Sequence, residues 1–320
     1  MNILCITPIR HLKGVFEKLQ SFGSITYKPN CTKDDLLILD LSKYNVIFCN
    51  PNKQPFLLDQ SVLKNYRGSI LTASTGLNHI DVKYCKENNI KILSHKNDHK
   101  QLLNNLPSTA ELSFTLMVSL LRKIPECKIH TSEFKWDYTA FMGRQIKDLN
   151  VGIIGYGRLG KMMAEYCIAF GAKVFIYDPY VFNSIESKDD IPGFYITKSL
   201  EDLFEKCDVI SIHVHVTHET KYMINKSLLN LPTKDLYLIN TSRGEIVNEV
   251  DVVNALKSGR LSGYGTDVVE SEFDNIKNSA IIKAMNDGEN IIVTPHIGGM
   301  TIEGQTKAYE WSINKLKEIK

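Results

Sequence analysis

A strand, a glycine-rich turn, a helix and a second strand follow one another between residues 151 and 178, and this segment constrains the fold more than any other. The first strand is a run of apolar or small residues, and the second ends at Asp178. The turn between the first strand and the helix carries a G-x-G-x-x-G pattern at Gly155, Gly157 and Gly160. This order predicts a β-α-β unit and, with it, a doubly wound parallel sheet.

Each residue type in this pattern has a physical role in binding a dinucleotide. Gly155 permits a tight turn, Gly157 lets a pyrophosphate approach the backbone, and Gly160 lets the helix pack closely on the strand. The N-terminus of the helix adds free N–H groups and the positive end of a dipole. A carboxylate at Asp178 would bind the ribose hydroxyls and repel a 2′-phosphate, which favours NAD over NADP.

The composition fits a globular enzyme of two domains. A chain of 320 residues is long for a single core, and its net charge of +2 gives no reason to expect a nucleic acid or an anionic membrane as a partner. The seven cysteines are scattered and form no C-x-x-C pair, so they indicate reduced thiols and a cytoplasmic protein. We expect no signal peptide, no membrane-spanning segment and no regulatory domain after the last helix.

Strands and helices alternate along the whole chain, which predicts parallel α/β sheets. In the N-terminal third the predicted strands are 2–6, 24–27, 46–49, 69–74 and 90–94. From residue 151 onward they are 151–155, 173–177, 208–214, 236–241, 263–268 and 291–294, six in all, which is the number that a full dinucleotide-binding sheet requires. We place the domain junction near residue 104.

A long helix is predicted to begin after this junction. Ser108 and Glu111 have the spacing of a capping box, and Pro125 ends the helical pattern. Apolar residues recur at helical spacing between these limits. Such a stripe packs either within one chain or against a second copy.

The unusual polar residues of the second half fall where predicted strands end. They are Asp178, Thr241 to Gly244 with Arg243 among them, Asp267 with Glu270 and Glu272 just beyond, and Pro295-His296. Because ligands of open α/β sheets bind outside the carboxyl ends of the strands, these groups are expected at one rim, beside the dinucleotide.

The chain carries several longer motifs, three of which contain residues of this group. They are Ser74-Thr-Gly-Leu-Asn-His-Ile-Asp81, Ser108-Thr-Ala-Glu111, Gly155-Tyr-Gly-Arg-Leu-Gly160, Ser211-Ile-His-Val214, Asn240-Thr-Ser-Arg-Gly-Glu-Ile-Val247, Gly265-Thr-Asp-Val-Val-Glu-Ser-Glu272 and Thr294-Pro-His-Ile-Gly-Gly299. With these motifs the chain resembles the NAD-dependent D-isomer-specific 2-hydroxyacid dehydrogenases, a family that includes phosphoglycerate, glycerate and D-lactate dehydrogenases. The resemblance runs from about residue 69 to residue 303, and the N-terminal third fits in pattern more than in motif.

The resemblance implies that Arg243, Glu272 and His296 are catalytic, and their chemistry suits the reduction of a 2-oxo acid. His296 would protonate the carbonyl oxygen, because imidazole titrates near neutrality. Glu272, which stands in the family's register where Glu270 does not, would orient the ring and favour imidazolium. Arg243 would bind the substrate carboxylate and polarise the ketone.

The resemblance also implies the binding residues and the domains. For NAD, as NADH, the implied residues are Gly155, Tyr156, Gly157, Arg158, Leu159, Gly160, Asp178, His213, Thr217, Thr241, Asp267 and Gly298. For the substrate they are Ser74, Thr75, Gly76 and Leu77, together with Arg243 and His296. The implied fold is α/β with a doubly wound Rossmann domain (104–300) and a smaller flavodoxin-like α/β substrate domain (1–103) completed by the C-terminal helix (301–320). A homodimer is also implied.

The substrate and one competing class of function stay open. A small D-2-hydroxy acid and its 2-oxo acid are expected, and phosphoglycerate, hydroxypyruvate and glyoxylate all fit. A phosphorylated substrate would require further cations, for which Arg10 and Lys53 are candidates while Thr72 is neutral. The alternatives are an NADH-sensing interaction protein of the corepressor type, which has the same fold, and a different NAD enzyme such as an amino-acid dehydrogenase or a hydrolase.

Histidines other than His296 point to no metal site. His213, His215 and His218 are close in sequence, but no cysteine accompanies them, and packing of the strand near the cofactor is the expected role. His79, His95 and His99 are assigned to the surface or to loops.

Three residues depart from the family pattern. His215 and Phe273 each stand where a proline is usual, and Asp148 stands where glycine is common. None of the three replaces a catalytic group.

Overall fold

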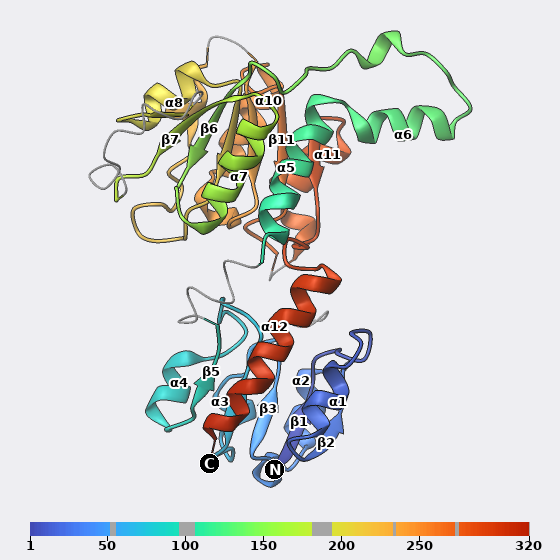
Figure 1. Cartoon of the computed structure of the whole chain (residues 1–320), viewed down its shortest axis with the longest axis vertical. Helices are drawn as coiled ribbons and strands as arrows, with labels where there is room; N and C mark the ends of the chain where they lie inside the picture. The colour runs from blue at the N-terminus through green and yellow to red at the C-terminus, as the bar shows by residue number, and fades with distance from the viewer. Residues whose placement is uncertain (52–55, 96–105, 181–193, 233–234, 273–274, 320) are drawn as a thin grey trace. The chain divides into compact units, whose positions relative to one another are not determined.

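The chain divides into two compact units in the computed structural model (Figure 1), Met1–Leu106 with Met300–Lys320, and Pro107–Gly299. Each unit is built around its own parallel sheet, which confirms the predicted fold class of two α/β domains. The structure describes residues 1–51, 56–95, 106–180, 194–232, 235–272 and 275–319. The predicted junction near residue 104 lies outside the described residues. Lys53, His99 and Phe273 also lie outside them.

The first unit has a five-stranded parallel sheet with the order β2-β1-β3-β4-β5. Its strands are β1 (Asn2–Cys5), β2 (Ser24–Tyr27), β3 (Val46–Phe48), β4 (Ser69–Leu71) and β5 (Ile92–Leu93). Its helices are α1 (Val15–Gln20), α2 (Lys33–Ile38), α3 (Gln60–Leu63), α4 (Val82–Glu87) and α12 (Ile302–Asn314), with 3-10 turns at Leu41–Lys43 and Lys315–Glu318. All five predicted strands are present, and the order is the flavodoxin-like form of a doubly wound sheet.

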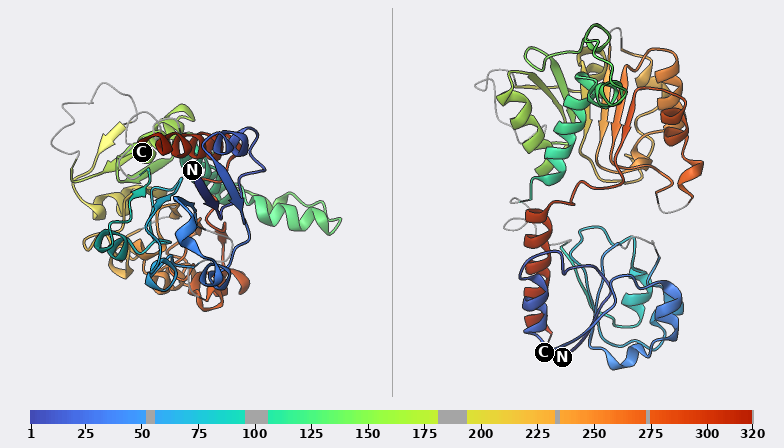
Figure 2. Two further views of the ribbon diagram at one scale, coloured as in Figure 1. Left: turned by 90° about the horizontal axis from the view of Figure 1, so that it is seen from below. Right: turned by 90° about the vertical axis from the view of Figure 1, so that its right-hand side faces the viewer.

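Both faces of this sheet are covered, because alternate residues of each strand point to opposite sides. On one face, Leu4 and its neighbours pack with α2, α3 and α4. On the opposite face, Ile3 and its neighbours pack with α1 and α12. Figures 1 and 2 show α12 lying beside α1, and Tyr309 and Ile313 of α12 are buried in this second core. The C-terminal helix is therefore part of the N-terminal unit.

The second unit has a seven-stranded parallel sheet with the order β12-β11-β10-β9-β6-β7-β8. Its strands are β6 (Asn150–Ile154), β7 (Lys173–Tyr177), β8 (Phe194–Ile196), β9 (Val209–Ile212), β10 (Tyr237–Asn240), β11 (Gly263–Thr266) and β12 (Ile291–Val293). The predicted count of six was wrong, because β8 adds an edge strand beyond β7. A strand this short shows too little alternation to stand out in the sequence. The strand order reverses between β6 and β9, as in a doubly wound nucleotide-binding sheet.

Helices cover both faces of the second sheet (Figure 2). They are α5 (Ser108–Leu121), α7 (Arg158–Ala169), α8 (Leu200–Lys206), α9 (Lys226–Leu229), α10 (Glu249–Lys257) and α11 (Ala280–Asn286); α6 (Ile124–Ser132) follows α5, and 3-10 turns lie at Thr139–Phe141, Gly244–Ile246 and Ile276–Asn278. Ile153 packs with α5 and α7, whereas the next residue, Ile154, packs with the core formed by α8 to α11.

Helix α5 differs from the prediction at its N-terminus. Pro107 is the N-cap and Ser108 is already helical, so the predicted capping box of Ser108 and Glu111 is wrong. The N–H of Glu111 donates to the Pro107 carbonyl instead. The apolar stripe of α5, which includes Met117 and Leu120, is buried against α7, β10 and β11 of the same chain. The stripe therefore offers no free surface to a second copy.

Candidate active site

The glycine turn joins β6 to α7 at the carboxyl edge of the second sheet. Gly155 has a φ of 89°, a left-handed conformation that is free of strain only without a Cβ. A Cβ on Gly160 would lie 2.0 Å from the Gly155 carbonyl oxygen, so helix and strand are too close for any side chain there. At Gly157, by contrast, no atom lies within 4 Å of where a Cβ would be. Open space therefore adjoins the first turn of α7.

The residues around this space fit a bound dinucleotide. Gly157 is the N-cap of α7 and makes no side-chain cap, so the first N–H groups of the helix can bind phosphate oxygens. The Oδ2 atom of Asp178 accepts a hydrogen bond from the backbone N of Tyr156 at 2.8 Å, which places the acid beside the turn. Arg158 is the first residue of α7; burial lowers the pKa of its guanidinium, which remains a cation at neutral pH.

His213 follows β9 and lies next to the same turn. Its backbone N donates to the Ile154 carbonyl at 2.7 Å, and its Nε2 lies 2.9 Å from the Ser211 hydroxyl. Burial lowers the pKa of His213 to about 4, so the ring is neutral at pH 7. His215 and His218 are exposed beyond the strand end. The predicted cofactor residue Thr217 lies in this exposed turn, where its backbone N donates to the Thr220 hydroxyl at 2.7 Å.

Glu272 and His296 form a hydrogen-bonded pair at the carboxyl edge of the sheet. The Nδ1 atom of His296 lies 2.9 Å from Oε2 of Glu272, and their side chains are 44% and 15% exposed. The turn that carries Arg243 packs against the same loop, because a Cβ on Gly244 would lie 2.3 Å from the backbone N of Glu270. The structure thus brings Glu272 to His296 and the Arg243 turn to the loop of Glu272.

Glu270, the other acid of this loop, has a different partner. The Tyr222 hydroxyl donates to its Oε1, and this hydrogen bond raises the pKa of Tyr222 to about 12. Glu272 is therefore the acid placed at the His296 ring.

Asp267 anchors the loop that carries His296. Its Oδ1 accepts from the Thr294 hydroxyl at 2.5 Å and from the Ile297 N at 2.8 Å, and its Oδ2 accepts from the Gly298 N at 2.7 Å. The residue is 1% exposed, and burial raises the pKa of its carboxyl while these hydrogen bonds lower it. The sequence pattern placed Asp267 and Gly298 at the cofactor; in the structure they bind each other and hold the loop.

Thr241 follows β10 and is buried as well. Its hydroxyl shares a hydrogen bond of 2.5 Å with the Ser113 hydroxyl of α5. The side chain that was predicted to bind cofactor thus ties α5 to the sheet.

The predicted substrate loop, residues 74–77, follows β4 in the first unit. The His95 N donates to the Ser74 carbonyl at 3.2 Å, and the Ile80 N donates to the Leu77 carbonyl at 2.9 Å. Among the hydrogen bonds between described residues, none uses a backbone N–H of residues 74–77 as its donor. Unused N–H groups in a short turn are a common binding site for an anion such as a carboxylate.

A sequence model of the NAD-binding domain of the D-isomer specific 2-hydroxyacid dehydrogenases matches residues 114–298. The chain belongs to this family. Over 240 residues it is 32% identical to a hydroxypyruvate reductase of Thermotoga maritima, and this alignment covers 74% of this chain and 72% of that protein. Over 233 residues it is 31% identical to a D-3-phosphoglycerate dehydrogenase of Bacillus subtilis, and this alignment covers 73% of this chain and 41% of that protein.

The fold of the whole chain is also found among solved structures. A D-lactate dehydrogenase from Aquifex aeolicus, solved with NAD and lactic acid, matches with a TM-score of 0.74 and 26% identity, covering 100% of this chain and 95% of that one. Membership of the family confirms three predictions: the family itself, the cofactor NAD, and an oxidoreductase that acts on a CH–OH group.

The sequence pattern missed a buried polar network in the first unit. His79 is 9% exposed and His95 is also buried, so the surface assignment of both was wrong, although both lie in loops. The Nε2 atom of His95 lies 2.9 Å from the Ser312 hydroxyl of α12. Asn50 donates from its amide nitrogen to the Tyr309 hydroxyl at 2.8 Å. The one signal in the sequence is that Asn50 directly follows a buried strand.

Proposed function

We propose that the chain interconverts a small D-2-hydroxy acid and its 2-oxo acid with NAD, and that Arg243, Glu272 and His296 carry the reaction. The observation that supports this most strongly is the hydrogen-bonded Glu272–His296 pair at the carboxyl edge of a sheet whose glycine turn fits NAD. An acid that holds an imidazole ring is the arrangement that general acid–base catalysis requires.

Each side chain has a separate task in this reaction. NADH, when bound, supplies the hydride. Glu272 engages Nδ1 of His296, which leaves Nε2 as the nitrogen that gives its proton to the carbonyl oxygen of the substrate. The carboxylate of Glu272 stabilises the imidazolium form from which that proton comes. Arg243 supplies a guanidinium for the substrate carboxylate and the polarised ketone.

The test is NADH oxidation with a panel of 2-oxo acids: pyruvate, glyoxylate, hydroxypyruvate and phosphohydroxypyruvate, each with and without ammonia. We expect turnover that does not depend on ammonia with at least one acid. Tight NADH binding without turnover of any acid would instead support a binding protein of the corepressor type. Turnover only with ammonia would indicate an amino-acid dehydrogenase.

We also infer a homodimer, formed through α6 and the segment that follows it. Figure 1 shows α6 extending away from the second sheet. Large apolar side chains are exposed along it and beyond it: Ile124, Ile129, Phe134, Trp136, Tyr138 and Met142, with Phe134 100% and Trp136 91% exposed. The segment is ordered by its own contacts, since the Asp137 N donates to His130 Nε2 at 3.1 Å. An exposed apolar patch on an ordered segment is typical of an interface between copies.

Sedimentation analysis tests the dimer. The wild-type chain should sediment as a dimer, and Phe134→Ser with Trp136→Ser should sediment as a monomer with an unchanged circular dichroism spectrum. A monomeric wild type, or a double variant that stays dimeric, would contradict this interface.

A cytoplasmic location is the third part of the proposal. All seven cysteines are free thiols, as expected of a reducing compartment. In the part of the chain that the structure describes, no helix has the length and apolar character needed to cross a bilayer. Cell fractionation would test the location directly.

A further inference from the structure

Glu249 is a buried carboxylate beside the loop of Glu272 (residues 267–272). It is the first residue of α10 and is only 7% exposed. Carboxylates buried this deeply are rare in proteins and are usually paired with a cation. None of the ion pairs between described residues includes Glu249. The groups that hold it are therefore neutral donors.

These donors come from two other segments of the second unit. Oε1 of Glu249 accepts the backbone N–H of Glu270 at 2.8 Å, and Oε2 accepts the Ser279 hydroxyl at 3.4 Å. Burial raises the pKa of the Glu249 carboxyl, while its hydrogen bonds, one of them from the Ile281 N–H, lower it. Ser279 is the N-cap of α11, and Ile281 lies in the first turn of that helix. Glu249 thus joins the start of α10 to the start of α11 and to the loop of Glu272.

The shortest of these hydrogen bonds acts on the peptide group between Val269 and Glu270. This peptide group donates its N–H to Glu249, and its carbonyl accepts the N–H of Glu272 at 3.2 Å. Because a peptide group is planar and rigid, an acceptor that fixes the direction of its N–H also fixes the direction of its carbonyl. Glu249 is therefore connected to the backbone of Glu272 through one rigid unit.

The turn of Arg243 packs against the same peptide group. A Cβ on Gly244, the residue after Arg243, would lie 2.3 Å from the carbonyl carbon of Val269 and 2.7 Å from its oxygen. From Gly244 the chain passes through a 3-10 turn into α10, where Glu249 is the first residue. A shift of this peptide group would therefore disturb the Arg243 turn as well as Glu272.

The position of Glu272 matters because its carboxylate has to meet one ring nitrogen. Oε2 of Glu272 lies 2.9 Å from Nδ1 of His296, and a hydrogen bond weakens steeply when its angle is lost. A displacement of about 1 Å at a catalytic group can lower the rate about a hundredfold. Groups that hold the backbone of this loop should therefore affect the rate without contacting the substrate.

We propose that Glu249 is a positioning residue of the reaction. Its carboxylate fixes the peptide group between Val269 and Glu270, and this peptide group holds Glu272 at the His296 ring. The assignment rests on the proposed function, in which Glu272 and His296 act as a pair. If Glu249 only stabilised the fold, its replacement would lower the melting temperature and leave kcat unchanged.

The test compares two replacements of Glu249, using the 2-oxo acid that the wild type reduces best. Glu249→Met keeps the length of the side chain but removes both acceptors, so kcat should fall at least about tenfold while the Kd of NADH stays within about twofold. Glu249→Gln should restore kcat to within about threefold of the wild type. Its carbonyl oxygen can accept the Glu270 N–H, and its amide nitrogen can donate to the Ser279 hydroxyl oxygen.

Ser279→Ala is the matched control for stability. It removes the N-cap of α11 and a second partner of Glu249, but it leaves the hydrogen bond to Glu270 in place. Its melting temperature should fall, because a lost N-cap destabilises a helix, and its kcat should stay within about twofold of the wild type. A kcat that falls as far in Ser279→Ala as in Glu249→Met would overturn the positioning role.

The other outcomes separate this role from the proposed function. A wild-type kcat in Glu249→Met, a Glu249→Gln as slow as Glu249→Met, or a Kd of NADH that rises together with the loss of kcat overturns the positioning role and leaves the proposed function standing. A wild type that reduces no 2-oxo acid overturns both. If Glu249→Met does not fold, Glu249→Asp replaces it. Its carboxylate is one methylene too short for the Glu270 N–H, so kcat should again fall at least about tenfold, and a wild-type kcat in this variant overturns the role.

Discussion

Nδ1 of His296 lies 2.9 Å from Oε2 of Glu272, while the backbone of His296 is held at a φ of 54°. A left-handed conformation at a residue other than glycine is strained, and it persists only where neighbouring groups hold it. Here Asp267 does so, because its carbonyl accepts the His296 N–H and its carboxylate binds the residues on either side. Glu272 thus holds the ring of His296, and Asp267 holds its backbone.

Replacing Glu272 should slow the reaction although His296 is still present. Glu272→Gln keeps the shape of the side chain but removes the charge that stabilises imidazolium, so kcat should fall about a hundredfold. Steady-state kinetics with the best 2-oxo acid measure this fall. Glu270→Gln, the matched control, should stay within a few-fold of wild type. A wild-type kcat in Glu272→Gln would contradict the role of the pair.

Arg243→Lys should separate positive charge from geometry. Lysine keeps the cation but loses the planar fork that binds a carboxylate through two hydrogen bonds. We expect kcat/KM for the 2-oxo acid to fall about a hundredfold, with most of the change in KM, and the Kd of NADH to stay as in wild type. Steady-state kinetics and NADH fluorescence titration measure the two quantities. A weaker affinity for NADH with a normal KM would place Arg243 at the cofactor instead.

The glycine turn permits a test with two matched variants. Gly160→Ala would put a Cβ 2.0 Å from the Gly155 carbonyl oxygen, so it should lower the stability by about 3 kcal/mol or more. Gly157→Ala meets no atom within 4 Å, so its melting temperature should match the wild type. Its Kd for NADH should nevertheless rise at least about tenfold, because the methyl group would occupy the approach to the phosphates. Normal NADH affinity in Gly157→Ala would show that no pyrophosphate lies there.

Asp178→Ser should relax the choice between NADH and NADPH. The carboxylate repels a 2′-phosphate, and a contact between like charges costs several kcal/mol, so the ratio of kcat/KM for NADH over NADPH should fall at least about tenfold. A serine hydroxyl can still accept from the Tyr156 N, which Asp178 binds at 2.8 Å in the wild type. The ratio is measured with saturating 2-oxo acid, and a ratio equal to that of the wild type would remove Asp178 from the ribose site.

His79 should make the stability depend on pH in a defined range. Its pKa is about 4 in the folded chain and 6.5 as the ordinary value, so the unfolded chain binds the proton first as the pH falls. The free energy of unfolding should therefore decrease as the pH falls from 6.5 to 4, and His79 alone should account for about 3 kcal/mol of this decrease. Above pH 7 the protonation of His79 should have no effect on the free energy of unfolding. Urea unfolding of His79→Gln beside the wild type isolates the effect. Parallel curves for the two proteins across this range would show that His79 is not buried in its neutral form.

The features that the sequence predicted well are those encoded by local pattern. The glycines at 155 and 160 mark a turn and a close approach that no other residue type allows, and long apolar strands with polar residues at their ends place Arg243 and His296 at one edge. Family register distinguishes Glu272 from Glu270, and in the structure it is Glu272 that lies at the His296 ring.

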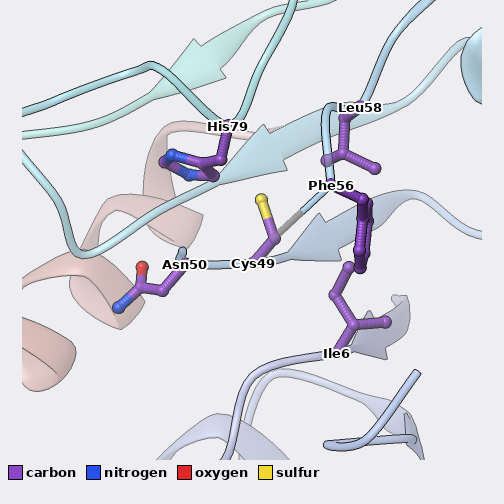
Figure 3. A pocket seen from close by; sticks show the side chains of 6 residues that line it. All are labelled: Ile6, Cys49, Asn50, Phe56, Leu58 and His79. Carbon is purple, nitrogen blue, oxygen red and sulfur yellow. The ribbon is translucent and has the colours of Figure 1, made fainter. Parts of the chain in front are cut away.

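The features that were missed depend on contacts between residues far apart in the chain. The hydrogen bonds of Asp267 to the N–H groups of Ile297 and Gly298 were not expected, because nothing near Asp267 in the sequence indicates them. His79 lies in a loop, as expected, but its burial was missed, because the groups that cover it come from strand ends in other parts of the chain (Figure 3). The edge strand β8 was missed because three residues show no clear period.

The most direct test is the turnover of His296→Asn, measured beside its affinity for NADH. Asparagine tolerates the left-handed backbone of this position, so the variant isolates the loss of the imidazole from any loss of structure. We predict that NADH oxidation with the best 2-oxo acid falls at least about a thousandfold while the Kd of NADH stays within about twofold. Full activity in His296→Asn would show that another group gives the proton, and the assignment of Glu272 as the partner of a catalytic histidine would be wrong as well.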